Sequence, residues 1–274
     1  MKPLNGRVCV VTGAARGLGL AIATALGAAG GKLALCDVLG DELEAAAAGL
    51  QAAGHEVFAA RCDISDSSAV DGYFANVAQQ LGPVDVLVNN AAVVPGRPED
   101  EARRNRHYAY LTTPEPRDTL GFTSAMSDAE WLRYWDVNVH GLFYCTRAAL
   151  RQMEPRRHGR IVNIASIAGL SALSAHSPHY SASKGAVIAF TRSVGAEVAG
   201  ANIFVNAIAP GGIATPMFDD YVGRLDETAR HRLFQMIPAG RLGTMEEYAS
   251  LVAYLAGDGH YLVGQIISPN GGMV

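Results

Sequence analysis

Three side chains between positions 166 and 184 could together move a proton: Ser166, Tyr180 and Lys184. A helix through Tyr180 would place Lys184, four residues later, on the same face and about one turn away. A free tyrosine titrates near ~10, and a cation held close favours the phenolate and lowers that pKa. A tyrosine tuned in this way can exchange a proton with an alcohol while a hydride is transferred. Ser166 ends an apolar run and could hold the same oxygen by a hydrogen bond.

A tyrosine four residues before a lysine is common, and alone it indicates only a partly exposed pair on a helix. The surrounding motifs favour a catalytic role for this pair over a partly exposed surface pair. Tyr180-Ser-Ala-Ser-Lys184, with Ser166 upstream and TGAARGLG at 12–19, resembles the short-chain dehydrogenase/reductase family. The resemblance covers nearly the whole chain, and the motifs follow the family's order.

Composition excludes several other classes of protein. The chain has 274 residues, 49% of them hydrophobic, which is enough for a sizeable core. A formal net charge of −4 gives no reason to expect nucleic acid as a partner. No signal peptide and no run of ~18 apolar residues is present, so we expect no membrane association. The four cysteines form no CxxC pair, which predicts buried free thiols and a cytoplasmic protein.

Strand-like and helical stretches alternate along the chain. Short β-branched runs predict strands buried on both faces, and alternation with helices predicts right-handed crossovers and a parallel sheet. We therefore expect one α/β domain over 1–274, a doubly wound (Rossmann) domain with about seven strands. The predicted strands are 7–12, 32–38, 57–63, 84–89, 160–166, 203–209 and 264–268. The first predicted helix follows a glycine-rich turn and ends at about residue 29. The other predicted helices span 41–53, 66–81, 127–154, 181–199 and 246–256.

A glycine-rich turn follows the first predicted strand. Gly13, Gly17 and Gly19 let the backbone turn tightly and approach a pyrophosphate, which the start of the following helix would favour. Glycines also serve simple turns, so the turn by itself is a weak signal. The resemblance adds Arg16 and Leu18 of the same turn to the cofactor contacts.

Asp37 ends the second predicted strand, 24 residues after Gly13. An acidic residue here can accept hydrogen bonds from the adenosine ribose hydroxyls. Because it would repel a 2′-phosphate, it predicts NAD rather than NADP as the cofactor. A cap for the helix at 41–53 is the alternative role, and Arg16 and Lys32 are the cations that would weaken the inference.

The resemblance implies further site residues. It places Asp63 and Ile64 at the adenine, and it gives Asn138 a bound water that completes a proton relay from the lysine to solvent. It also makes Lys184 a ligand of the nicotinamide ribose, beside Tyr180. The remaining implied cofactor contacts are Asn89 and Ala91 in a segment resembling NNAG, and Pro210, Gly211, Ile213 and Thr215 in one matching PGxIxT.

Two segments are expected to shape the substrate side. The stretch 93–127 is longer than the family pattern and is predicted to be an inserted loop, and 215–240 is predicted to be a helical flap. The charges at Arg103, Arg104, Arg106 and His107 indicate a solvated face. The alternative is a lid or inter-subunit arm near the substrate mouth that supplies a cation for an anionic substrate. For His176 and His179 a surface loop and a position facing the substrate are both open.

These observations together predict an NAD-dependent oxidoreductase that acts on a secondary alcohol or its ketone, without a metal. The family resemblance implies a homotetramer. One alternative is a 3-ketoacyl-thioester reductase, which shares every motif and usually favours NADPH. A second alternative is a regulatory protein that binds the dinucleotide without turnover.

Overall fold

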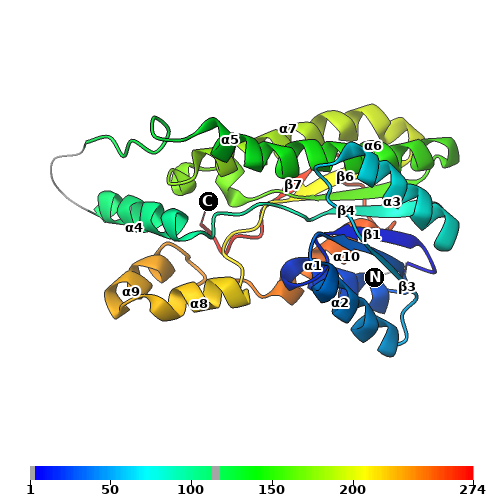
Figure 1. Ribbon diagram of the computed structural model, residues 1–274, viewed down its shortest axis with the longest axis horizontal. Coiled ribbons are helices and arrows are strands. Elements are labelled where there is room, and N and C mark those ends of the chain that lie inside the picture. Colours follow the sequence, from blue (N-terminus) through cyan, green and yellow to red (C-terminus); the bar gives the residue numbers. More distant parts are fainter. Residues whose placement is uncertain (1–3, 113–117, 274) are drawn as a thin grey trace.

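The computed structural model describes residues 4–112 and 118–273, and seven parallel strands form one sheet within these residues. The strand order is β3-β2-β1-β4-β5-β6-β7 (Figure 1). The predicted α/β class and parallel sheet are therefore confirmed. The strands are β1 Val8–Thr12, β2 Lys32–Asp37, β3 Val57–Arg61, β4 Val84–Asn89, β5 Gly159–Ile164, β6 Ile203–Ile208 and β7 Ile266–Ile267.

Helices cover both faces of this sheet, which is why its central strands are buried along their whole length. One face carries α1 (Gly17–Ala28), α2 (Gly40–Ala52) and α10 (Met245–Ala256). The other carries α3 (Ser67–Gln80), α6 (Leu142–Met153) and α7 (Pro178–Val198). All four cysteines are free and buried in or beside these cores, as the sequence predicts.

The strand order reverses between β1 and β4, because the chain crosses from β3 back to the other side of β1. Ligands of open α/β sheets bind beyond the carboxyl ends of strands at such a point. The two strand ends are tied together by Thr12, whose hydroxyl accepts hydrogen bonds from the backbone N–H groups of Asn90 and Ala91 at 3.1 and 3.0 Å. The crevice is thus rigid where a cofactor would enter.

The long helix expected at 127–154 is present, but its middle is widened. It consists of α5 (Asp128–Trp135), a π-helical segment (Asp136–Gly141) and α6. Ser127 begins it by accepting a hydrogen bond from the Glu130 N–H at 3.2 Å. The Glu130 carboxylate pairs with Arg103. Short 3₁₀ turns lie at Glu154–Arg156, Ile167–Gly169, Ala172–Ser174 and Ala199–Ala201.

The predicted inserted loop is not a loop throughout, because it contains the helix α4 (Pro98–Thr112). Proline at its first position and three acidic residues in its first turn suit a helix start, and these signals were readable in the sequence. Asp100 accepts hydrogen bonds from the N–H groups of Gly96 and Arg97 at 3.1 and 3.0 Å. Residues 113–117 of the predicted insertion lie outside the described residues.

The predicted flap is a pair of helices, α8 (Pro216–Arg224) and α9 (Glu227–Gln235). Figure 1 shows α4, α8 and α9 together beyond one end of the sheet, on the side where the strands' carboxyl ends point. None of the described helices combines the length and apolar character that a membrane span needs.

Candidate active site

Ser166, Tyr180 and Lys184 line one cavity of about 380 Å³. Ser166 comes from the end of β5, and the other two come from the first turns of α7. Strand β5 is fully buried, and α7 begins with proline at its first position, so both elements are firmly placed. The fold therefore brings the three residues together at one cavity, as their spacing predicts.

Ser166 is positioned by its own backbone. It is extended and caps the following 3₁₀ turn, with its Oγ accepting from the Ala168 N–H at 3.1 Å. Its hydroxyl is also hydrogen-bonded to the Tyr180 phenol. The hydroxyl donates its one proton to the phenol and keeps a second acceptor site for an alcohol, so it must turn its proton to bind a substrate carbonyl.

The expected lowering of the Tyr180 pKa by Lys184 is wrong for the protein alone. Burial raises the pKa of Tyr180, and only the hydrogen bond from Ser166 opposes that rise. The Lys184 ammonium lies 5.8 Å from the centre of the tyrosine ring. Tyr180 is thus a neutral phenol in the free protein, because desolvation outweighs the hydrogen bond from Ser166.

Lys184 is buried, and burial lowers its pKa to about 8. Its Nζ donates a hydrogen bond to the Ile164 carbonyl at 2.8 Å, and that leaves further N–H donors for a ligand. A buried ammonium with a carbonyl partner gains from any hydroxyl or anion that enters the cavity. This suits the ribose contact that the family resemblance implies.

Asn138 lies behind the cavity rather than in its lining. It is buried in the π-helical segment, and its Oδ1 accepts from the Val93 N–H at 2.7 Å. Its Nδ2 donates to the Val93 carbonyl and to Ser183 Oγ, both at 3.0 Å. The side chain therefore clamps the segment after β4 to α7, and the relay role stays a prediction.

The glycine-rich turn has the shape that an anion site needs. Gly13 and Gly17 have φ angles of +66° and +58°, which glycine adopts without strain. A Cβ at Gly19 would lie 2.0 Å from the Gly13 carbonyl oxygen. No side chain caps the start of α1, so its free N–H groups remain available for a pyrophosphate. Arg16 is turned away to pair with Glu42 at 3.3 Å, while Leu18 lines the cavity.

Asp37 stands at the carboxyl end of β2 beside this turn. Its Oδ2 accepts from the Ala15 N–H and its Oδ1 from the Leu39 N–H, both at 3.1 Å. It therefore combines the predicted position with part of the alternative capping role. Lys32 lies at the opposite end of β2 and pairs with Glu56. Arg61, which the sequence reasoning did not consider, is the register partner of Asp37 on β3.

Of the residues implied to contact the adenine, Asp63 is exposed and Ile64 is buried, and Asn89 at the end of β4 is buried as well. Asp63 is exposed and accepts from the Ser65 N–H at 2.9 Å, whereas Ile64 is buried against Gly141. Asn89 points into the core, where its amide donates to Thr146 and Asn163 at 3.0 and 2.8 Å.

The residues next to Asn89 define the cavity edge instead. Asn90 lines the cavity, and its amide donates to the Thr12 and Gly13 carbonyls, both at 3.0 Å. The cofactor contact implied for Asn89 stays a prediction. Ala91 abuts Gly13, since a Cβ there would lie 2.7 Å from the Ala91 Cα.

The segment after β6 forms the other wall of the cavity. All four of its implied contacts line it, namely Pro210, Gly211, Ile213 and Thr215. Thr215 also begins α8 by accepting from the Phe218 N–H at 3.3 Å. The flap thus starts from the same residue that is implied to hold the nicotinamide.

Arg104 and His176, for which a place at the substrate side was left open, line the cavity. Tyr108 lines it as well, and sequence reasoning did not consider this residue. Arg104 and Tyr108 come from α4. His176 is buried, and burial beside Arg104 and His107 lowers its pKa to about 3, so it is neutral. The ring nitrogens Nδ1 of His176 and His107 are 3.4 Å apart.

The expected solvated face on α4 is therefore wrong for His107, which is 3% exposed, and for Arg103, which pairs with Glu130. Neither of the two positions left open for His179 is found, since it is not on the surface and does not line the cavity around Tyr180. This ring is fully buried, with its centre 4.0 Å from that of Tyr134.

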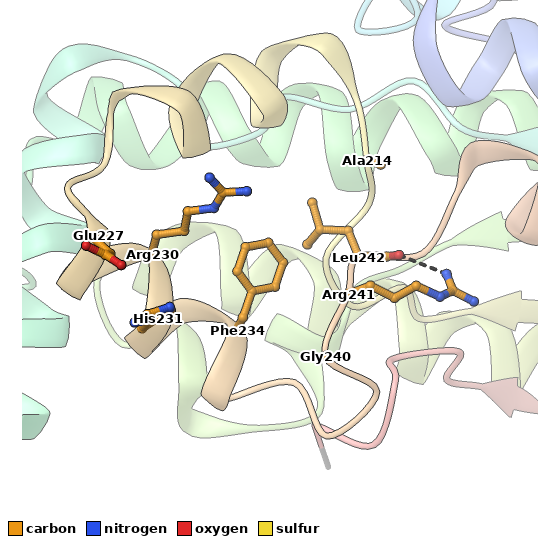
Figure 2. A pocket seen from close by; sticks show the side chains of 8 residues that line it. All are labelled: Ala214, Glu227, Arg230, His231, Phe234, Gly240, Arg241 and Leu242. Atoms are coloured by element: carbon orange, nitrogen blue, oxygen red, sulfur yellow. Dashed lines mark hydrogen bonds between the residues drawn. The ribbon is translucent and has the colours of Figure 1, made fainter.

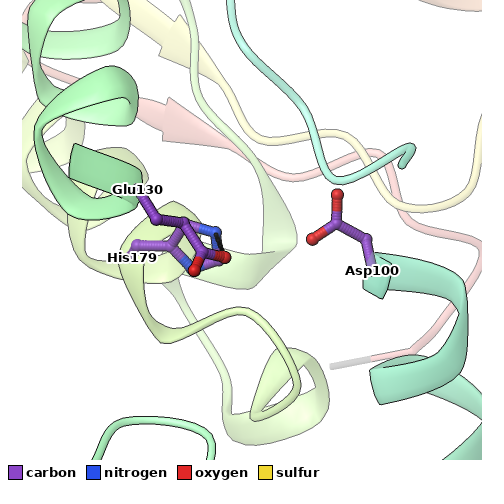
Figure 3. A group of neighbouring side chains, drawn as sticks. All are labelled: Asp100, Glu130 and His179. Carbon is purple, nitrogen blue, oxygen red and sulfur yellow. Dashed lines mark ion pairs between the residues drawn. The ribbon is translucent and has the colours of Figure 1, made fainter. Parts of the chain in front are cut away.

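Asp100, Glu130 and His179 resemble a metal site, since their potential ligand atoms lie within 4.8 Å of one another (Figure 3). Their contacts supply another explanation. Asp100 caps α4, and the Glu130 carboxylate accepts both terminal guanidinium nitrogens of Arg103. Arg103 already provides the positive charge, so the group anchors α4 to α5 and α7.

A second cavity, of about 660 Å³, lies between α9 and the segment that follows it (Figure 2). Arg241 at its edge donates to the Leu242 carbonyl at 2.9 Å and pairs with Glu247. None of the predicted catalytic residues lines this cavity. The chemistry therefore belongs to the cavity around Tyr180.

Comparison with known proteins agrees with this geometry. The family model described as short chain dehydrogenase matches residues 7–224. The 3-oxoacyl-[acyl-carrier-protein] reductase FabG of Thermotoga maritima is 32% identical over 272 residues, which cover 99% of each chain.

Two solved structures match along the whole chain. A putative gluconate dehydrogenase from Agrobacterium tumefaciens superimposes with a TM-score of 0.85 and 29% identity, covering 99% of this chain and 97% of that one. A variant of the actinorhodin polyketide ketoreductase, solved with NADPH, superimposes with a TM-score of 0.83 and 34% identity. The match covers 100% of this chain and 99% of that one.

Proposed function

This chain belongs to the short-chain dehydrogenase/reductase family, and from that premise we propose that it transfers a hydride between NAD and a secondary alcohol or its ketone. The observation that carries the proposal is the meeting of Ser166, Tyr180 and Lys184 on one cavity. The cavity also contains the segment after β6 that is implied to hold the nicotinamide. A protein that only binds the dinucleotide has no use for a proton-transfer group at this place.

The residues present fit a nicotinamide dinucleotide. The uncapped start of α1 and the Gly13–Gly19 turn suit the pyrophosphate, and Asp37 suits the adenosine ribose. Lys184 suits the nicotinamide ribose. When bound, the coenzyme supplies the hydride acceptor or donor, and the protein supplies position and proton transfer.

Proton transfer falls to Tyr180. In oxidation its phenolate takes the proton of the alcohol, and in reduction its phenol returns a proton to the carbonyl oxygen. Ser166 holds the same oxygen by a hydrogen bond, and the Lys184 ammonium favours the phenolate that oxidation requires. Because burial raises the pKa of Tyr180, oxidation should accelerate with rising pH through the alkaline range and reduction should slow.

Coenzyme choice is proposed to rest on Asp37. We expect Asp37→Ala to weaken NAD and to lower the preference for NAD over NADP by about 10- to 100-fold, the worth of a hydrogen bond to a charged group. Initial rates with each coenzyme at saturating alcohol measure that ratio. Asp37→Asn removes the charge at nearly the same shape and keeps one of the two oxygens that accept from the Ala15 and Leu39 N–H groups, so it separates charge from shape.

The neighbouring cation refines this test. Arg61 lies opposite Asp37 in the β2–β3 register, so it is placed to meet a 2′-phosphate once the carboxylate is gone. Removing Arg61 together with Asp37 should cancel any gain with NADP. Asp41→Ala, at an exposed acid of the next helix, is the matched control and should change nothing. An unaltered coenzyme ratio in Asp37→Ala would contradict the assignment.

A second candidate is reduction of a 3-oxoacyl thioester with NADPH. It is favoured by the name of the Thermotoga maritima relative and by the ketoreductase solved with NADPH. Absorbance of the reduced nicotinamide separates the two candidates. Turnover of secondary alcohols with NAD supports the first, whereas turnover only of acetoacetyl thioesters with NADPH would replace it with the second.

A further inference from the structure

Helix α4 forms one wall of the cavity that holds Tyr180. Arg104 and Tyr108 of this helix line the cavity together with Tyr180 and Lys184. The helix is held on two sides, by the Arg103–Glu130 pair to α5 and by the Glu101–Arg224 pair to α8, the latter at 2.6 Å. Figure 1 shows it beside α8 and α9, beyond the end of the sheet. It is therefore a fixed part of the substrate site.

Arg104 is held in place without a negative partner. One terminal nitrogen donates to the Pro95 carbonyl at 3.1 Å, and the guanidinium stacks 4.7 Å from the centre of the Tyr221 ring. Its neighbours differ, since Arg97 pairs with Glu99 and Arg103 with Glu130. Among the carboxylates whose side chains the structure describes, none pairs with Arg104. A guanidinium has five N–H donors in a planar fork, so donors remain for a ligand.

The rest of the cavity carries no charge that could satisfy Arg104. No aspartate or glutamate is found among its described lining residues, and its only other cation is Lys184. His176 beside Arg104 is neutral. Most of the wall is apolar, with Val94, Leu173, Phe218 and Met236 among its residues. In such surroundings a cation without a carboxylate partner attracts an anion strongly.

From these contacts we propose that the substrate carries a carboxylate, which Arg104 binds while Tyr180 faces the alcohol or ketone carbon. The guanidinium fork matches a carboxylate in two parallel hydrogen bonds. The other cation of the cavity, Lys184, is implied to hold the nicotinamide ribose, so Arg104 remains for the substrate. A single guanidinium balances a monoanion, whereas a phosphate monoester carries a charge of about −1.5 to −2. This inference rests on the proposed function, because it names the substrate class of that same site.

Paired substrates test it. Levulinate, γ-acetylbutyrate and β-benzoylpropionate place a ketone at different distances from a carboxylate, and each has a neutral methyl ester. With NADH, the protein should reduce at least one acid with a kcat/KM about 10- to 100-fold above that of its ester. Arg104→Gln should remove that preference, mainly through a raised KM for the acid. Equal kcat/KM values for all acids and their esters in the unaltered protein overturn the proposal.

Two further variants separate charge from packing. Arg104→Lys keeps the charge and loses the fork, so it should retain part of the preference. Arg106→Gln is the matched control, because Arg106 is exposed on the same helix and does not line the cavity. It should behave as the unaltered protein. A loss of preference in Arg106→Gln equal to that in Arg104→Gln would also overturn the proposal.

Binding separates failure of this inference from failure of the proposed function. Calorimetric titration of the NAD-loaded protein with β-benzoylpropionate and its primary amide needs no turnover. Tighter binding of the acid, lost in Arg104→Gln, supports the carboxylate site even when no ketone is reduced. Turnover of neutral ketones without any preference for the acid in either experiment leaves the proposed function standing and removes the carboxylate site.

Discussion

Tyr180→Phe should lose about 10²- to 10⁴-fold in kcat while binding NAD as the unaltered protein does. The range is the usual contribution of general acid–base catalysis, and the substitution removes only the phenol oxygen. The ring remains to fill its place in α7, so the fold should persist. Single-turnover rates with a secondary alcohol, together with a coenzyme titration, measure the two effects separately. A kcat within about threefold of normal would remove Tyr180 from the mechanism.

The chain offers a matched control at Tyr134. Its ring lies 6.2 Å from that of Tyr180, and its buried hydroxyl has no hydrogen-bond partner among the described residues. Tyr134→Phe therefore removes the same oxygen from the same neighbourhood without touching the cavity. It should keep full activity. A similar loss in both variants would show that local packing, rather than proton transfer, explains the effect.

Lys184→Met should lose roughly 10²-fold or more in turnover, because the group that favours the phenolate and is implied to hold the ribose is gone. It should also change how stability depends on pH. The pKa of Lys184 is lowered by burial to about 8, below the ~10.4 of an unfolded lysine. The lysine therefore binds its proton more tightly in the unfolded chain than in the folded protein. Below about pH 8 the buried charge destabilises the fold by roughly 3 kcal/mol.

That penalty should disappear as the pH rises from about 8 to ~10.4, so the unaltered protein gains stability over this window. Lys184→Met should lack the gain. Denaturant titrations of both proteins at pH 7 and pH 10 measure the difference. Lys32→Met is the control, because Lys32 forms a surface pair with Glu56 and its loss should leave both activity and the pH trend unchanged. Parallel trends in all three proteins would contradict the buried-charge assignment.

Local sequence determined the architecture. Short β-branched runs alternating with helical stretches predict a parallel sheet, and the seven strands lie where these runs are. The spacing of Tyr180 and Lys184 likewise predicts one face of a helix, and α7 places both residues on the cavity. These features depend on neighbours along the chain, so they are readable without a structure.

Only the tertiary structure determines the pKa values of the site residues and which residues form the cavity wall. The raised pKa of Tyr180 and the lowered pKa of Lys184 come from burial, which no spacing records. The direction of Asn89 into the core depends on its register in β4. Arg103 and Arg104 are adjacent in sequence, yet one pairs with Glu130 and the other faces the cavity. Which of the two arginines reaches the cavity depends on how α4 is oriented and anchored against the rest of the protein. That orientation depends on contacts between segments far apart in the chain.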